Sequence, residues 1–124
     1  MKVIFNDSSD ATICRVDREQ IKRVMINLLD NALAAIDDRG EIVIDLSYDE
    51  KFETVKIEVA DNGKGIPPDH KTRLFEPYFS TKKHGTGLGL AIVNSIISDH
   101  NGTIVVRDNK PCGTRFIIEL PVKV

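Results

Sequence analysis

Three glycines, at positions 85, 87 and 89, form the strongest chemical signal in this chain. The run reads Gly-Thr-Gly-Leu-Gly-Leu over residues 85–90, and an apolar, helix-periodic segment begins within it. Glycine has no Cβ, so the backbone there can turn sharply and approach a ligand closely. A helix starting at Leu88 would direct free N–H groups and the positive end of its dipole at the loop. The pattern favours an anion site, with phosphate as the expected anion, although a flexible loop before a helix looks the same.

Two asparagines, Asn27 and Asn31, lie one turn apart in a predicted helix. Asparagine is a poor helix former, so two on one face need a reason. An amide oxygen is a hard, neutral ligand that suits Mg²⁺, an ion that takes few protein ligands and fills its shell with water and phosphate. The alternative is that both amides bond to neighbouring backbone or to solvent.

A carboxylate, Asp61, ends a predicted strand and is followed by Gly63 and Gly65. An ionised aspartate only accepts hydrogen bonds, so in a pocket it suits an exocyclic amine such as that of adenine. The two glycines would let the backbone approach a flat base, and the Thr114 hydroxyl could complete the pocket. An ordinary Asp-Asn-Gly turn and an ordinary strand threonine are the alternatives.

The segment before the glycine run combines aromatic and basic residues. Phe75 and Phe79 would anchor a loop by burying their rings. Lys82, Lys83 and His84 could then meet phosphates when the loop closes. A solvated basic loop over a small aromatic cluster is the alternative.

Length and composition exclude several classes of protein. The 124 residues are expected to form one domain, residues 1–124. A net charge of −2, mixed along the chain, argues against a nucleic-acid binder, and no apolar run reaches membrane-spanning length. Cys14 and Cys112 lack CxxC spacing, which favours a reduced, cytosolic setting, and both are interpreted as buried or half-buried. His70 and His100 are interpreted as surface residues.

Periodicity and turn signals predict the elements that position these residues. Strands are expected over residues 2–5, 12–16, 41–48, 54–60, 103–107 and 114–120, and helices over 18–37, 69–75 and 88–100. Asp17 and Gln20 form a capping-box pattern before the first helix, and Asn101 with Gly102 is a helix stop. A loop is expected over 76–86. The order predicts an α+β fold of two layers, a mixed sheet with helices packed on one face.

Taken in order, these motifs resemble those of the catalytic ATP-binding domain of sensor histidine kinases, in the group that includes gyrase B, Hsp90 and MutL-type ATPases. Residues 27–32 resemble the family's asparagine box, 61–66 and 85–90 its glycine boxes, 74–79 its phenylalanine box and 113–116 its last strand motif. The resemblance covers almost the whole chain and is closest to nitrogen-regulation-type kinases. It implies a Bergerat-type ATP-binding sandwich.

The resemblance also implies roles for individual residues. Asn31 would hold Mg²⁺, Asp61 would bind the adenine amine with help from Thr114, and residues 79–87 would form a lid over ATP. The implied catalytic residues are Asn27, Asn31 and Lys82. The implied ATP-binding residues are Asn27, Asn31, Ala35, Asp61, Gly63, Gly65, Ile66, Phe79, Thr81, Lys82, Gly85, Thr86, Gly87, Leu88, Gly89, Leu90 and Thr114.

Asn27 occupies the position that separates the kinases from their hydrolysing relatives. In the ATPases of the group, a glutamate stands one helical turn before the magnesium asparagine and activates water, whereas an amide cannot act as a general base near neutral pH. Phosphoryl transfer should therefore go to a nucleophile from elsewhere. In this family the acceptor is a histidine on a separate helical dimerisation domain, and none of His70, His84 and His100 has the family's His-Glu or His-Asp context.

The function implied is that of an ATP-dependent protein-histidine kinase in two-component signalling, with ATP and Mg²⁺ bound and a response regulator downstream. The domain is expected to be cytoplasmic and monomeric in isolation, without nucleic-acid or membrane contact, in a parent protein that could be membrane-anchored. Two alternatives stay open. One is a serine kinase of the anti-sigma type, which shares the fold, and the other is a non-catalytic nucleotide-binding or interaction module.

Overall fold

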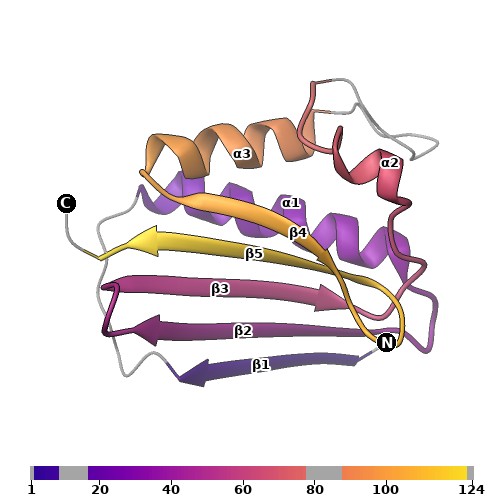
Figure 1. The fold of residues 1–124 in the computed structure, drawn as a ribbon. Coiled ribbons are helices and arrows are strands. Elements are labelled where there is room, and N and C mark those ends of the chain that lie inside the picture. Colours follow the sequence, from indigo (N-terminus) through magenta and orange to yellow (C-terminus); the bar gives the residue numbers. More distant parts are fainter. Residues whose placement is uncertain (1, 9–16, 78–87, 123–124) are drawn as a thin grey trace.

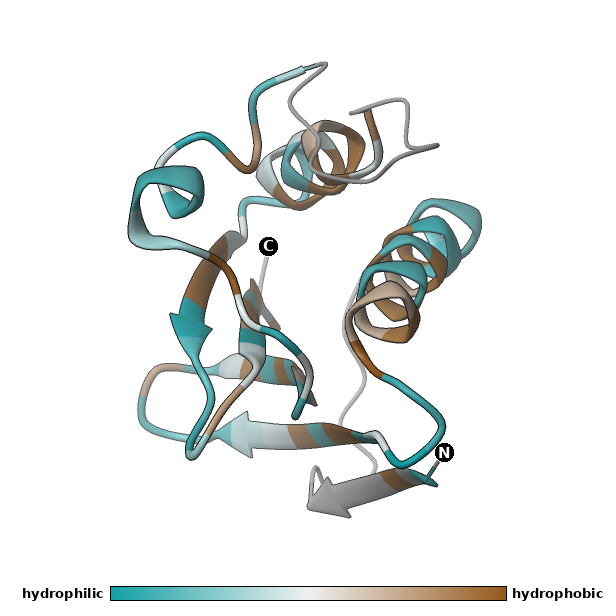
Figure 2. Cartoon of the chain, turned by 90° about the vertical axis from the view of Figure 1, so that its right-hand side faces the viewer, coloured by the Kyte–Doolittle hydropathy of each residue, from teal (hydrophilic) through white to brown (hydrophobic). Residues whose placement is uncertain are grey.

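The chain folds into a five-stranded sheet with two long helices on one face (Figure 1). The computed structural model describes residues 2–8, 17–77 and 88–122. In chain order the elements are β1 (Lys2–Ser8), α1 (Arg18–Ala35), β2 (Glu41–Asp49), β3 (Thr54–Asp61), α2 (Pro68–Lys71), α3 (Gly89–Asp99), β4 (Thr103–Asp108) and β5 (Thr114–Pro121). Figure 2, turned by 90°, shows α1 and α3 side by side above the sheet.

The sheet has the strand order β1-β2-β3-β5-β4. The first pair, β1 and β2, is parallel and is connected through α1, because parallel neighbours need a crossover. The other three pairs are antiparallel, and their register places Asp61 of β3 opposite Thr114 of β5. The predicted two-layer α+β fold with a mixed sheet is therefore confirmed.

One hydrophobic core fills the space between the helices and the sheet. The two long helices contribute apolar side chains every three or four residues, and β2, β3 and β5 contribute them at every second residue. The buried members of this core are Val24, Leu28, Ala32, Ile42, Ile44, Val59, Val93, Ile96, Ile97, Phe116, Ile118 and Leu120.

Helix α1 begins as predicted and ends two residues earlier. Asp17 is the N-cap, and its carboxylate accepts the Gln20 N–H at 3.0 Å. At the other end, Ile36 is already extended. The Ala35 carbonyl accepts the Lys64 N–H at 3.1 Å, so a loop distant in sequence replaces the next helical turn.

Helix α3 ends at the predicted stop. Its C-cap residue, His100, differs from the prediction that it is a surface residue. Asn101 is left-handed, with φ of 60°, and the Gly102 N–H reaches back to the Ile97 carbonyl at 2.9 Å. The His100 ring is half-buried, not a surface group. Its Nδ1 lies 2.8 Å from the Ile96 carbonyl oxygen, and its Nε2 accepts the Asp17 N–H at 2.9 Å. His100 thus joins the end of α3 to the start of α1.

Other differences from the predictions are local. The strand predicted over 2–5 extends to Ser8, because an edge strand tolerates polar residues when it pairs with β2. The helix predicted over 69–75 is shorter, the four residues Pro68–Lys71 of α2, and is followed by turns with hydrogen bonds between residues three positions apart. Cys112 is exposed, not buried, while His70 is half-buried. Cys14 and the strand predicted over 12–16 lie outside the described residues.

Two leucines of α1 test how far the core determines stability. Leu28 has no exposed surface, whereas Leu33 on the same helix is 44% exposed. We expect Leu28→Ala to lower the free energy of unfolding by about 2–5 kcal/mol, because it leaves a cavity. Leu33→Ala should change it by roughly 0.5 kcal/mol. Urea unfolding measures both, and equal losses would contradict the proposed arrangement of the core.

Candidate nucleotide-binding site

The predicted site residues that the structure describes gather at one end of the molecule. On the right-hand side of Figure 1, the end of α1, the end of β3 and the starts of α3 and β5 come together. These four chain segments carry Asn31, Asp61, Gly89 and Thr114 in turn. Residues far apart in the sequence, from Asn31 to Thr114, therefore meet at one edge of the sandwich.

Asp61 is the buried charge of this site. It is the last residue of β3 and only 3% of its surface is exposed. One carboxylate oxygen, Oδ1, accepts the Gly63 N–H at 2.9 Å. Burial raises the pKa of the Asp61 carboxyl above its ordinary value, while backbone N–H groups of Gly63 and Thr114 act in the opposite direction. The result is a desolvated acceptor held by main-chain donors, with Thr114 equally buried beside it.

The glycine loop after β3 is packed against the end of α1. A Cβ at position 63 would lie 2.1 Å from the Ala35 carbonyl oxygen, so only glycine fits there. Gly65 has a positive φ of 75°, a conformation that also favours glycine. Ala35 and the loop are therefore in contact, as expected for residues assigned to one site. The local structure itself also explains why glycine occupies positions 63 and 65.

The two asparagines of α1 use their amide nitrogens for backbone contacts. Nδ2 of Asn27 donates to the Gly89 carbonyl at 3.1 Å, which ties α1 to the first residue of α3. Nδ2 of Asn31 donates to the Asn27 carbonyl, also at 3.1 Å. Within the described residues, neither Oδ1 takes part in a hydrogen bond. Both expectations for these amides are thus compatible, since a backbone contact leaves the oxygen available as a ligand.

Helix α3 starts at this end, and no side chain of the described residues caps its first turn. Leu88 is the N-cap residue, and it cannot bond to the N–H groups that follow. A Cβ at Gly89 would lie 4.0 Å from Cγ of Asn27, an ordinary contact. The described surroundings therefore do not require glycine at position 89, which leaves close approach of a ligand as a reason for it.

Three of the predicted aromatic and apolar residues pack against the hydrophobic core. Phe75 packs edge-on against Phe116 of β5, with 6.5 Å between ring centroids, while most of the loop that it is predicted to anchor lies outside the described residues. Ile66 and Leu90 are half-buried against the core. The remaining predicted residues lie outside the described part of the chain: Phe79, Thr81, Lys82, Lys83, His84, Gly85, Thr86 and Gly87.

Sequence reasoning missed the turn between β4 and β5. Nδ2 of Asn109 donates to the main-chain carbonyl of Asp61 at 2.8 Å. Sγ of Cys112 lies 3.3 Å from the Asn62 carbonyl oxygen. Both residues stand in a stretch that looks like an ordinary polar turn, so no local signal identifies them.

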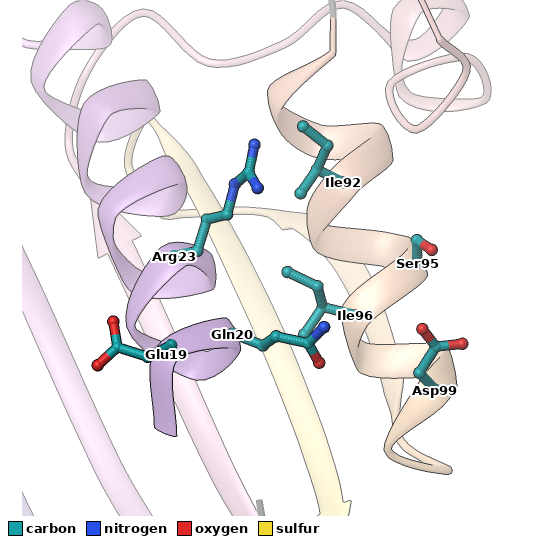
Figure 3. A pocket seen from close by; sticks show the side chains of 7 residues that line it. All are labelled: Glu19, Gln20, Arg23, Ile92, Ser95, Ile96 and Asp99. Carbon is teal, nitrogen blue, oxygen red and sulfur yellow. The ribbon is translucent and has the colours of Figure 1, made fainter. Parts of the chain in front are cut away.

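A separate groove lies between the first half of α1 and α3. It has a volume of about 390 Å³, and its lining residues are Glu19, Gln20, Arg23, Ile92, Ser95, Ile96 and Asp99. Figure 3 shows Gln20 and Arg23 reaching from α1 toward Ile92 and Ile96 on α3. None of these residues belongs to the predicted site.

Comparison with known proteins agrees with this arrangement. Residues 16–124 match the family described as histidine kinase-, DNA gyrase B-, and HSP90-like ATPase. Over 110 residues, the chain is 44% identical to sensor histidine kinase ZraS of Escherichia coli O157:H7, covering 89% of this chain and 24% of that protein. It is 41% identical over 117 residues to the sensory histidine kinase/phosphatase NtrB of Rhodobacter capsulatus, covering 86% and 33%. The chain thus spans a quarter to a third of these relatives.

Solved structures give the same result for the fold. The catalytic domain of histidine kinase ThkA superposes with a TM-score of 0.88 at 36% identity, covering 98% of this chain and 78% of that one. ThkA in complex with the response regulator protein TrrA superposes with a TM-score of 0.76 at 35% identity, covering 98% and 34%. The NtrB match also agrees with the expected nitrogen-regulation type. The chain belongs to the histidine kinase-, DNA gyrase B-, and HSP90-like ATPase family, as an ATP-binding catalytic domain of the kind found in two-component sensor kinases.

Proposed function

We propose that this domain binds Mg-ATP and donates the γ-phosphoryl group to a histidine on a helical dimerisation domain. The observation that carries the proposal is the buried Asp61 carboxylate, beside the end of α1 and the start of β5. The family membership supports it, and ThkA, a relative that forms a complex with a response regulator, supports such a regulator as the downstream partner.

The base end of the proposed site is Asp61. A carboxylate accepts the adenine amine, but it would face the carbonyl that guanine has at the same position, acceptor against acceptor. Thr114, equally buried, would assist through its hydroxyl. Gly63, Gly65 and Ile66 would line the approach to the base. The site is therefore expected to prefer adenine over guanine nucleotides.

The phosphate end of the proposed site is the start of α3. The Leu88 side chain does not cap the N–H groups of the first turn, and these groups together with the helix dipole favour a phosphate there. Asn27 holds this helix end through the Gly89 carbonyl, so it would position the phosphate-binding backbone. Leu90 fixes the first turn in the core, and residues 79–87 are proposed as the lid, with Lys82 as a phosphate contact.

The donor chemistry at Asn31 fits a magnesium ion. Its nitrogen is held by the Asn27 carbonyl, so the neutral amide oxygen is the atom left to act as a hard ligand. Among the described residues, no three acidic, histidine or cysteine side chains cluster as an all-protein metal site. This agrees with an ion shared between one amide, water and phosphate. When bound, Mg²⁺ would neutralise charge on the phosphates.

The phosphate acceptor is proposed to lie outside this chain. An amide at position 27 cannot activate water, and its nitrogen is already engaged with Gly89. His100 is held at both ring nitrogens by Ile96 and Asp17, so it is not offered as a nucleophile.

Among the helices that the structure describes, none combines the length and the apolar character needed to cross a membrane.

Replacing Asp61 tests the base specificity. We expect Asp61→Ala to weaken ATP binding about ten-fold or more, because a hydrogen bond to a charged group is lost, and to leave GTP binding almost unchanged. Asp99→Ala, at the exposed end of α3, is the matched control. Competition against a fluorescent nucleotide measures both affinities. Equal wild-type affinities for ATP and GTP would refute the assignment.

Replacing Asn31 tests the metal site. The wild-type domain should bind ATP several-fold more tightly in Mg²⁺ than in EDTA. Asn31→Ala should remove most of this difference while keeping the affinity measured in EDTA, since base recognition lies elsewhere in the pocket. The exposed Asn94→Ala is the control. An unchanged magnesium effect in Asn31→Ala would make this amide a purely structural one.

Labelling with γ-labelled ATP tests the reaction. The purified domain alone should hydrolyse ATP slowly, because Asn27 cannot activate water. It should also acquire little label, because none of its three histidines has the family's phosphoacceptor context. Adding a histidine-containing dimerisation domain in trans should give acid-labile phosphohistidine on that domain, weakly, since the effective concentration supplied by a covalent link is absent. Acid-stable phosphoserine would favour the serine kinase alternative. Binding of ATP without transfer to any domain would favour the non-catalytic module.

A further inference from the structure

The turn between β4 and β5 holds the main chain of Asp61. Nδ2 of Asn109 donates to the Asp61 carbonyl oxygen at 2.8 Å, across 48 positions of sequence. This contact is partly buried, so water replaces it less readily than at the surface. The Asp61 backbone is thereby fixed independently of the Gly63 contact to its carboxylate.

Asn109 is itself held in place by its own turn. Its side-chain oxygen accepts the Lys110 N–H at 3.0 Å, and its backbone N–H donates to the Gly113 carbonyl at 3.0 Å. The amide group therefore has one fixed orientation, with the oxygen used inside the turn and the nitrogen directed at Asp61. A side chain ordered in this way loses little further entropy when it makes the contact.

The same turn approaches the end of β3 very closely at a second point. Gly113 has a φ of 105°, and a Cβ there would lie 2.0 Å from the Asp61 carbonyl oxygen. The residue that follows it, Thr114, supplies one of the two N–H groups that act on the Asp61 carboxyl. The turn thus fixes the Asp61 carbonyl and, through the next residue, the direction of its carboxylate.

We infer that Asn109 is a positioning residue for base selection. It acts through Asp61, and the inference rests on the proposed role of Asp61 as the acceptor of the adenine amine. A hydrogen bond to a base amine depends steeply on the angle and distance of the acceptor. Loosening the Asp61 backbone should therefore reduce the discrimination between ATP and GTP, with little change in the contacts to phosphate.

The test compares ATP and GTP affinities by competition in four variants, with Asp61→Ala as a fifth variant for reference. Asn109→Ala should weaken ATP binding about three- to ten-fold and leave GTP binding unchanged. Asn109→Asp keeps an acceptor for the Lys110 N–H but cannot donate to Asp61, so it should lose at least as much selectivity. Asn94→Ala, an exposed asparagine on α3, is the control for a lost amide. Asp61→Ala/Asn109→Ala should have the same ATP/GTP ratio as Asp61→Ala.

The ratio separates positioning from simple destabilisation. A variant that is partly unfolded loses ATP and GTP binding by the same factor, so its ratio stays at the wild-type value. If Asp61→Ala lowers the ratio but Asn109→Ala does not, the inference for Asn109 is wrong. An Asn109→Ala change that persists at full size in the Asp61→Ala background would also overturn it, because Asn109 would then act independently. A ratio unchanged by Asp61→Ala itself would instead refute the proposed function.

Discussion

The close contact between residue 63 and the Ala35 carbonyl is the constraint on which the site depends. It exists because glycine has no Cβ, and it brings the loop after β3 within 3.1 Å of the same carbonyl through the Lys64 N–H. One carbonyl oxygen thus terminates α1 and anchors the loop. Since α1 carries the asparagines and β3 carries Asp61, this contact sets the distance between the two halves of the site. A larger side chain at position 63 would separate them.

Hydrogen bonds, and not an ion pair, stabilise the negative charge of Asp61 in the part of the chain that the structure describes. No ion pair compensates Asp61 among the described residues, and its ionised form is supported by main-chain N–H groups alone. Folding raises the pKa of the Asp61 carboxyl, so the unfolded chain releases this proton at a lower pH than the folded chain does. The contribution of Asp61 to the free energy of unfolding therefore falls as pH rises from the unfolded pKa through the folded pKa. A ligand that donates a hydrogen bond to the carboxylate offsets part of the free energy that burial of this charge costs. The free domain therefore favours ligands that carry such a donor.

Much of the fold follows from local patterns. Apolar periodicity identified both long helices and four of the five strands closely, and capping residues such as Asp17 marked where the first helix starts. The ends of elements were less predictable, as at Ala35, because a carbonyl bound by a distant loop has no local signature. The contacts of His100 and Asn109 were missed for the same reason. Each joins segments more than 40 positions apart, and neither residue differs locally from an ordinary helix stop or turn.

The site lies at one end of the sandwich, so the opposite end is under different structural constraints. The turn between β2 and β3 lies there, with Phe52 68% exposed and its backbone N–H capped by Asp49. This hairpin connects neighbouring antiparallel strands and carries none of the residues assigned to the site. Surface turns of this kind accept insertions and sequence drift with little loss of stability. Lineages that share the chemistry of the site can therefore diverge in length and sequence at this turn, and an inserted tag or reporter domain is best placed there.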